Sequence, residues 1–186
     1  MARQLDIALI IDLEATCWRE GSPPDGQQQE IIEIGVATID LTTLQPLDKH
    51  SLLVTPTEST VSEFCTELTT ITQEMVDRDG VSLAEACRWL RKELLAPKRL
   101  WMSWGDFDRR HVERECARKE IRYPFGPSHM NAKTLFALSQ GLPRECGMTE
   151  ALDQLGFALE GTHHRGVDDA WNTARIVSHV LQRARN

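Results

Sequence analysis

The first third of the chain has the hydrophobic pattern of β-strands. Residues 5–12 (LDIALIID) form a nearly continuous apolar run, which predicts a strand buried on both faces at the centre of a sheet. Residues 31–41 and 44–54 are rich in β-branched side chains and are separated only by Thr42 and Thr43, which predicts two hairpin strands. The polar stretch 19–29, with its prolines, glycines and glutamines, predicts a loop.

Helix signals follow the predicted hairpin. Thr70-x-x-Gln73 and Ser82-x-x-Glu85 have the form of capping boxes, in which side chains at the start of a helix satisfy free backbone N–H groups. We expect each to begin a helix, with Gly80 between the two and the second helix covering residues 82–95.

The rest of the chain predicts one late strand and several helices. The strand covers residues 99–104, and the helices cover residues 106–120, 132–140, 149–155 and 167–184. Strands first, then helices, indicate an α/β fold in which a mixed β-sheet is flanked by helices. At 186 residues the chain is expected to form a single domain, 1–186, with an ordinary hydrophobic core.

The composition narrows the classes of function. The net charge of −7 argues against a protein that coats nucleic acid through overall basicity. It is compatible with a nuclease, because carboxylates gathered around divalent cations would be neutralised by the ions. The five cysteines are widely spaced and contain no Cys-x-x-Cys pair, which argues against disulfides or a cysteine zinc site and favours the cytoplasm. No apolar stretch approaches the roughly 18 residues of a membrane span, so no membrane partner is expected.

Asp12 and Glu14 are the first candidate site residues. Side chains two apart in a strand point to the same face, so both carboxylates would project together from the C-terminal end of the first strand. Ligand sites of α/β folds usually lie at that end. By itself, the pair is more typical of a strand that runs into a polar turn.

A second acidic pair, Asp106 and Asp108, follows the predicted strand at 99–104. Asp106 is suited to cap the next helix, with its side chain accepting a hydrogen bond from a free backbone N–H. Asp108 lies two residues further on, where it would face the edge of the sheet. We therefore favour Asp108 as a metal ligand and Asp106 as the cap.

A third group precedes the C-terminal helix. His164 and Asp169 are five residues apart, so on one continuous helix they would point about 140° away from each other. They can meet only if His164 lies in the loop before the helix, which Gly161 and Gly166 would allow. The neighbouring His163 is expected to be solvated.

These three groups together match the needs of two-metal phosphodiester hydrolysis. Two divalent ions need several carboxylates, and the reaction needs a base that works near neutral pH. Asp and Glu supply the hard oxygen ligands that suit Mg²⁺ or Mn²⁺, and a histidine, with an unperturbed pKa of about 6.5, suits the base.

In this order the residues resemble the DEDDh exonucleases, the DnaQ-like branch of the RNase H-like superfamily. Asp12 and Glu14 match the first motif, Asp108 the second, and His164 with Asp169 the third. The similarity extends over most of the chain. The segments DLEATC (12–17), SWGDFD (103–108) and GVDD (166–169) are similar to the histone-mRNA and enhanced-RNAi 3′ exoribonuclease subgroup.

The resemblance implies an RNase H-like mixed sheet of about five strands, the first three antiparallel. It implies 3′→5′ hydrolysis of single-stranded nucleic acid, with RNA favoured over DNA, to nucleoside 5′-monophosphates, with two Mg²⁺ or Mn²⁺ ions. Four acids would hold the metals and His164 would act as general base; the acids are Asp12, Glu14, Asp108 and Asp169.

Residues near the first two motifs are candidates for substrate contact. The backbone at Ala15 and Thr16 is expected to contact the terminal nucleotide. Trp18 either stacks on a base or anchors the 19–29 loop. The basic side chains between Arg109 and Arg122 either hold the phosphate backbone or, as we favour, form a solvated helix face.

Two other functions stay open at the level of sequence. One is a DNA-directed proofreading or repair exonuclease, because contacts to the 2′-hydroxyl that separate RNA from DNA cannot be seen in a single chain. The other is a catalytically idle regulatory module on the same fold, against which the intact set of five site residues argues.

Overall fold

One five-stranded sheet runs through the computed structural model of the chain, which describes residues 4–127 and 129–185. The strand order is β3-β2-β1-β4-β5. The first three strands pair antiparallel, whereas β4 pairs parallel with β1, and β5 parallel with β4. The strands are β1 (Gln4–Ala15), β2 (Ile31–Asp40), β3 (Gln45–Leu53), β4 (Arg99–Ser103) and β5 (His129–Asn131). The predicted mixed α/β sheet is confirmed.

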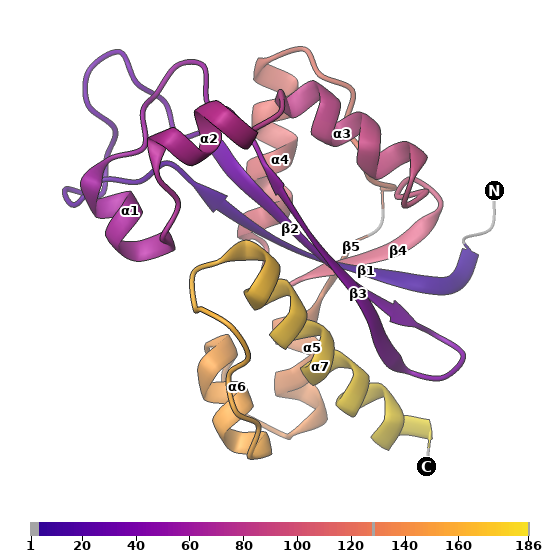
Figure 1. Ribbon diagram of the computed structural model, residues 1–186. Coiled ribbons are helices and arrows are strands. Elements are labelled where there is room, and N and C mark those ends of the chain that lie inside the picture. The colour runs from indigo at the N-terminus through magenta and orange to yellow at the C-terminus, as the bar shows by residue number, and fades with distance from the viewer. Residues whose placement is uncertain (1–3, 128, 186) are drawn as a thin grey trace.

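Helices cover both faces of this sheet (Figure 1). Those on one face are α3 (Leu83–Lys92) and α4 (Phe107–Arg118); those on the other are α5 (Ala132–Ser139), α6 (Met148–Leu155) and α7 (Gly166–Arg185). Two short helices, α1 (Glu63–Thr69) and α2 (Gln73–Asp79), lie beside one end of the sheet. Within the described part of the chain, no helix combines the length and apolarity that a bilayer crossing requires.

The apolar run of β1 explains its central position. Leu9 and Ile11 face the core under α3 and α4, whereas Ala8 and Ile10 face α7. All four side chains are at most 1% exposed. Because side chains alternate along a strand, a continuous apolar run is what a strand covered on both faces requires.

The helices before residue 80 differ from the prediction. Thr70 does not begin a helix; it ends α1 with a left-handed backbone, φ 63°. The helix start is Thr72, whose side chain accepts a hydrogen bond from Met75 N–H at 3.2 Å. Gln73, expected to complete the capping box, instead accepts from the backbone of Val61 at 2.8 Å. The prediction of a Thr70 cap was therefore wrong, and α1 was missed, whereas the Ser82 capping box is confirmed.

Candidate active site

Asp12 and Glu14 lie at the C-terminal end of β1, as predicted. They stand opposite Gly35 and Glu33 of β2, and the register shifts directly after Glu14. Glu14 is 9% exposed, whereas Asp12 is partly exposed. Two carboxylates therefore project from the central strand at the place where the sheet ends.

Asp108 comes to the same place from the first turn of α4. Its Oδ1 accepts a hydrogen bond at 3.0 Å from the backbone N–H of Leu13, the residue between the two acids of β1. Asp106 takes the N-cap position, but its side chain accepts no capping hydrogen bond, so that part of the prediction was wrong. Its carboxylate lies instead 3.7 Å from both Arg109 and His129.

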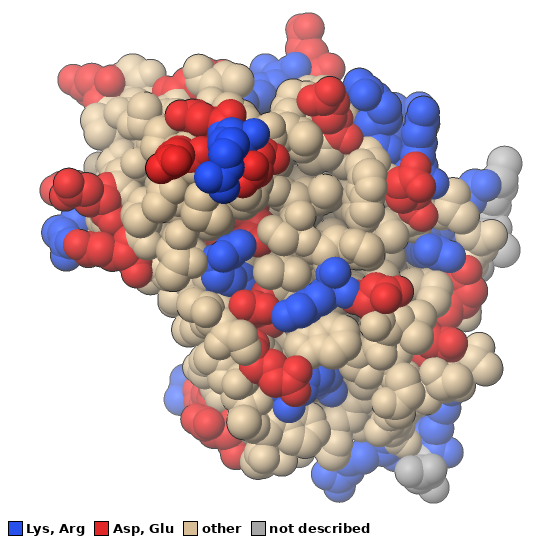
Figure 2. All heavy atoms as spheres, viewed as in Figure 1, with Lys and Arg blue, Asp and Glu red and all other residues tan. Residues whose placement is uncertain are grey.

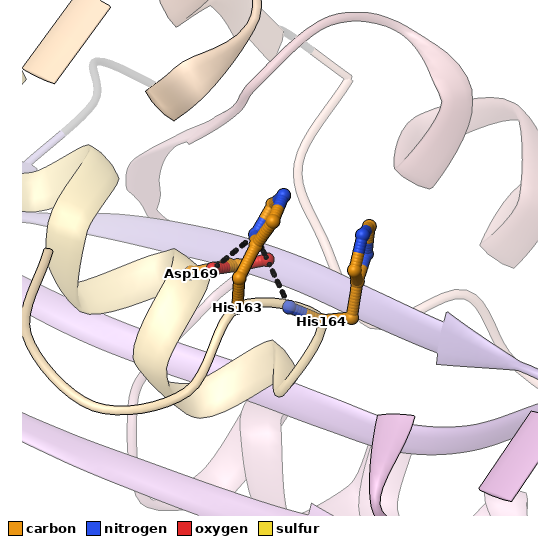
Figure 3. Close-up of side chains that lie close together, drawn as sticks. All are labelled: His163, His164 and Asp169. Carbon is orange, nitrogen blue, oxygen red and sulfur yellow. Dashed lines mark hydrogen bonds and ion pairs between the residues drawn. The ribbon is translucent and has the colours of Figure 1, made fainter. Parts of the chain in front are cut away.

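Asp169 reaches the site from the first turn of α7, beside two histidines in the preceding loop (Figure 3). Its Oδ2 accepts the backbone N–H of His164 at 3.0 Å and lies 2.9 Å from Nδ1 of His163. The two imidazole rings stack with centroids 3.9 Å apart. His164 does lie in the loop before the helix, with a left-handed backbone at φ 63°. His163, expected to be solvated, keeps 39% of its side chain exposed and also contacts Asp169.

The start of α7 is held against the sheet by β2. Glu33 is fully buried, and its Oε2 accepts the backbone N–H of Gly166 at 2.8 Å and lies 3.3 Å from Arg165. A Cβ added to Gly35 would lie 1.9 Å from the carbonyl carbon of Gly166. Gly35 is thus required for the close approach of the Gly166 backbone, whereas Gly161 adopts the positive φ that the loop needs, +81°.

The carboxylates crowd one another strongly. Burial, with the nearby Asp108 and Glu14 carboxylates, raises the pKa of Asp12 well above its usual range. Burial and the Asp169 and Glu33 carboxylates raise the pKa of Glu14 to about 9. Burial raises the pKa of Asp108 to about 6, although the Leu13 N–H acts in the opposite direction. Such crowding is relieved either by protonation of the carboxylates or by bound cations.

The donor atoms fit divalent cations. Asp12, Glu14 and Asp169 each offer a carboxylate oxygen, and these atoms lie within 4.8 Å of one another. Hard oxygen ligands of this kind suit Mg²⁺ or Mn²⁺. His163, His164 and Asp169 form a second group with the same spacing, but its two nitrogen donors are less suited to these ions.

A cavity of about 320 Å³ opens over these groups. All five predicted catalytic residues line it, with His163 beside them. Its remaining wall is largely apolar and includes Trp104, Phe107 and Met148. Phe107 is 53% exposed, although it is a large apolar residue. This wall was not predicted from the sequence; the one available signal was the position of Phe107 inside the SWGDFD segment.

The predicted substrate contacts of Ala15, Thr16 and Trp18 do not lie at this cavity. Thr16 is fully buried, and its backbone N–H donates to the Glu30 carbonyl at 2.8 Å, so that this group is not available to a nucleotide. Ala15 is 8% exposed and pairs with Ile31. Trp18 is 9% exposed, which favours an anchor for the 19–29 loop over a stacking platform.

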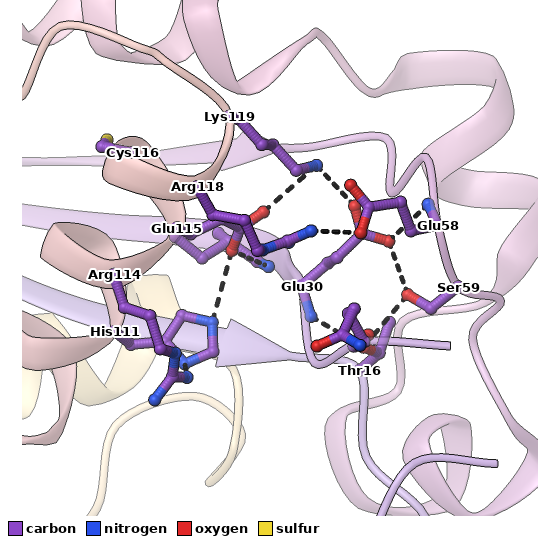
Figure 4. A network of polar contacts seen from close by, with 12 residues as sticks. Thr16, Glu30, Glu58, Ser59, His111, Arg114, Glu115, Cys116, Arg118 and Lys119 are labelled. Atoms are coloured by element: carbon purple, nitrogen blue, oxygen red, sulfur yellow. Dashed lines mark hydrogen bonds and ion pairs between the residues drawn. The ribbon is translucent and has the colours of Figure 1, made fainter. Parts of the chain in front are cut away.

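The basic C-terminal end of α4 is bound within the protein (Figure 4). Lys119, which follows α4, pairs with Glu30 and lies 3.3 Å from Glu115, while Arg118 pairs with Glu58. Since these cations already have internal partners, this part of 109–122 does not offer a free phosphate-binding face. The predicted solvated helix face is confirmed for Arg110 and Arg114, which are exposed, whereas Lys119 at the end of α4 is only 15% exposed.

Comparison with known proteins identifies the family. The family model described as Exonuclease (RNase_T) matches residues 9–177. The chain belongs to this exonuclease family. It is 32% identical to the 3′-5′ exonuclease Snipper of Drosophila melanogaster, over 94% of this chain and 69% of that protein. It is 33% identical to the human 3′-5′ exoribonuclease 1, over 95% of this chain and 53% of that protein. The chain thus spans about half the length of the human relative.

Solved structures agree with this assignment. The nuclease domain of 3′hExo, a DEDDh family member bound to rAMP, aligns with a TM-score of 0.84 at 30% identity over 98% of this chain and 95% of that one. A 3′-exonuclease in a structure of histone mRNA stem-loop recognition aligns with a TM-score of 0.83 at 29% identity, over 96% and 82% of the chains. The predicted RNase H-like fold and DEDDh type are confirmed. The chain is a 3′→5′ exonuclease of a type that depends on divalent metal ions.

Proposed function

We propose that this exonuclease removes nucleotides from the 3′ end of single-stranded RNA, with two Mg²⁺ or Mn²⁺ ions held by Asp12, Glu14, Asp108 and Asp169. The observation that carries the proposal is the convergence of these four carboxylates, from β1, α4 and α7, on one cavity with His164 at its side. When bound, the ions would neutralise the carboxylates, help to ionise the attacking water and stabilise charge on the phosphate.

His164 is proposed as the general base that takes a proton from the attacking water. Burial lowers its pKa, and the adjacent His163 adds to this effect, so the ring is neutral and able to accept a proton at pH 7. Its backbone N–H is fixed by Asp169, whereas its ring nitrogens make no hydrogen bond among the described residues. The Nδ1 of His163, in contrast, already contacts Asp169.

Preference for RNA is supported by the relatives. The human relative is a 3′-5′ exoribonuclease, and the aligned structures contain rAMP in one case and a histone mRNA stem-loop in another. We therefore expect this chain to shorten RNA faster than DNA of the same sequence.

The decisive experiment incubates the protein with 5′-labelled single-stranded RNA or DNA, in Mg²⁺ or Mn²⁺ and then in excess chelator. We expect a ladder of products shortened from the 3′ end, which is lost on chelation and in Asp12→Ala. A ladder from DNA alone would identify a DNA-directed nuclease instead. No shortening of either polymer by folded, metal-loaded protein would indicate a catalytically idle module.

The two histidines are distinguished by substitution. His164→Ala should lower kcat by a factor on the order of 100 to 10,000, the range of general acid–base catalysis. His163→Ala should have a far smaller effect. Equal losses, or a larger loss in His163→Ala, would transfer the role of base to His163.

We also propose a reducing compartment such as the cytoplasm. All five cysteines are free, and four of them are buried. Sγ of Cys87 lies only 3.8 Å from Sγ of Cys116, so an oxidising environment would favour a bond between them. Mass spectrometry of the alkylated native protein should find both thiols reduced; a Cys87–Cys116 disulfide would contradict the proposal.

A further inference from the structure

Five of the seven residues that line a second cavity, of about 400 Å³, are basic. They come from α3, from the segment leading into β4 and from the segment after α4. These side chains are Arg88, Arg91, Lys92, Lys98 and Arg122, with Leu95 and Pro97 completing the wall. In Figure 2, blue side chains gather on the upper right of the molecule, on the side where Figure 1 places α3. We call this surface the basic pocket.

No acid of the described residues forms a salt bridge with the cations of the basic pocket, although Glu85 and Glu93 lie near Arg88 and Lys92 beside it. Nine other Lys and Arg residues do form salt bridges. Within the described part of the chain, Arg91 is the one side chain of the five that donates a hydrogen bond, to the carbonyl of Arg122 at 2.7 Å. Like charges gathered at one place repel one another, and an anion bound between them would relieve this repulsion.

The dipole of α3 explains the position of only some of these cations. Arg91 and Lys92 lie in the last turn of α3, where cations interact favourably with the helix dipole. Lys98 and Arg122 belong to other segments, and both are exposed, as is Arg88. Three chain segments therefore bring cations to one cavity in a protein whose net charge is −7.

The basic pocket lies at the far end of the sheet from the carboxylates. The carbonyl of Lys98 accepts a hydrogen bond from the backbone N–H of Gln4, at the start of β1, whereas Asp12 lies near the end of the same strand. Gln4 and Asp12 are eight residues apart along the strand. At about 3.3 Å per residue, the basic pocket therefore lies about 26 Å from the carboxylates. A stacked nucleic-acid strand advances about 3.4 Å per phosphate, so about eight nucleotides would cover this distance.

We propose that the basic pocket binds the phosphate backbone of the RNA strand whose 3′ end occupies the active site, about eight or more nucleotides upstream of that end. This inference rests on the proposed RNA substrate. Exposed arginine and lysine side chains around a cavity bind phosphate groups without selecting bases. The contact would therefore increase the affinity for long strands of any sequence and leave the chemistry at the 3′ end unchanged.

The test compares oligonucleotides of different length. The variant Arg88→Gln/Lys98→Gln/Arg122→Gln removes three exposed charges of the basic pocket, and Arg78→Gln/Arg144→Gln/Arg183→Gln removes three exposed charges elsewhere. On a 20-nucleotide RNA the first variant should raise KM on the order of tenfold with little change in kcat. On a 4-nucleotide RNA both variants should behave as the wild type. The salt dependence of binding to the long RNA should also weaken, by about 2 in the logarithmic slope.

A direct binding measurement keeps this inference separate from the proposed function. Fluorescence anisotropy with labelled 20-nucleotide RNA in chelator needs no catalysis, and the pocket variant should bind more weakly than the control variant. Equal binding by wild type and both variants would overturn the inference even if all three shorten RNA. Absence of RNA shortening by the wild type would instead remove the proposed function. If only binding of inorganic polyphosphate were lost in the pocket variant, the site would belong to a free anion and the inference would be wrong.

Discussion

Phe107 is a large apolar side chain at the mouth of the active site, directly before the predicted metal ligand Asp108. It lines the cavity, is 53% exposed, and its ring lies 5.3 Å from that of the buried His111. An exposed aromatic ring beside a nuclease site offers a surface on which a base can stack, whatever its sequence.

Replacing Phe107 by Ala should therefore weaken substrate binding. Loss of one stacked base costs about 1–3 kcal/mol, which corresponds to an increase in KM of roughly 5- to 150-fold with kcat little changed. Steady-state kinetics on a short RNA would measure this change in KM. Leu138→Ala provides the control, because Leu138 is 76% exposed on α5 and does not line the cavity. An unchanged KM with a reduced kcat would assign Phe107 to the positioning of Asp108 instead.

Glu30 is a buried carboxylate outside the active site whose partners determine its charge (Figure 4). Burial alone would raise its pKa, but the Lys119 ammonium and hydrogen bonds from Thr57, Ser59 and Glu58 outweigh it and lower the pKa to about 2. Because the folded-state pKa lies below the ordinary 4.5, the ionised form stabilises the fold above pH 4.5, and this contribution is lost as the pH falls toward 2.

The shift of Glu30 corresponds to about 3 kcal/mol of unfolding free energy at pH 7. Glu30→Gln should lower the free energy of unfolding by a similar amount at pH 7, and by much less at pH 3. Urea titrations at the two pH values would measure both differences. Glu67→Gln is the control, because Glu67 forms an exposed ion pair with Arg19. It should change the free energy of unfolding by less than about 1 kcal/mol. A pH-independent loss in Glu30→Gln would attribute the effect to packing.

At the scale of elements, the contact between β2 and the start of α7 aligns the third motif with the first. Gly35→Ala would place a methyl group 1.9 Å from the Gly166 backbone, so the helix start has to move away from the sheet. Overpacking of this kind costs about 1–3 kcal/mol or more. We expect a lower melting temperature together with a large loss of activity, because Asp169 and His164 move with the helix.

Gly147→Ala is the matched control for stability. Gly147 has an extended backbone with φ −64°, and an added Cβ would meet nothing within 4 Å. The melting temperature of the Gly147→Ala variant should stay close to that of the wild type. If Gly35→Ala also retained wild-type stability and activity, the close contact with Gly166 would not be what positions α7.

How far the elements could be predicted depended on their length. β1 and α7 have 12 and 20 residues, enough for a clear hydrophobic pattern, and both were predicted. β5 has three residues and α1 seven, too few for a period to show, and both were missed. The choice of Thr72 over Thr70 as a helix start depends on a contact between Gln73 and Val61, which no local pattern reveals.

Site residues that follow from local sequence could be predicted, whereas those that depend on contacts between distant parts of the chain could not. Acids at strand and helix ends were predicted, because the position of such ends follows from local sequence and α/β folds gather them at one edge. Glu33 was not assigned a role, since its partner Arg165 lies 132 residues away. The apolar wall with Phe107 was missed for a similar reason: the exposure of a side chain is a property of the folded chain.

At the scale of the whole molecule, charge is separated between two places. Carboxylates gather at one end of β1, and unpaired cations gather around the pocket near its other end. Metal ions would reverse the sign of the field at the carboxylate end, so that a single polyanionic strand could be attracted at both places. The metal-free and metal-loaded proteins should therefore differ in protonation as well as in affinity for nucleic acid.

Metal binding should release protons at neutral pH. With a pKa of about 9, Glu14 holds a proton at pH 7 in the metal-free protein, and Asp12 has a raised pKa as well. A metal ligand has to be a carboxylate, so protons compete with the ion and the affinity for Mn²⁺ should rise by up to about tenfold per pH unit below pH 9 for each proton displaced. Calorimetric titrations with Mn²⁺ at pH 7 in two buffers of different ionisation enthalpy would count the protons. Glu14→Gln should lower this count by about one, because the amide has no proton to give up. Equal heats in both buffers would mean that the carboxylates are already ionised before the metal binds, and that another positive charge holds them together.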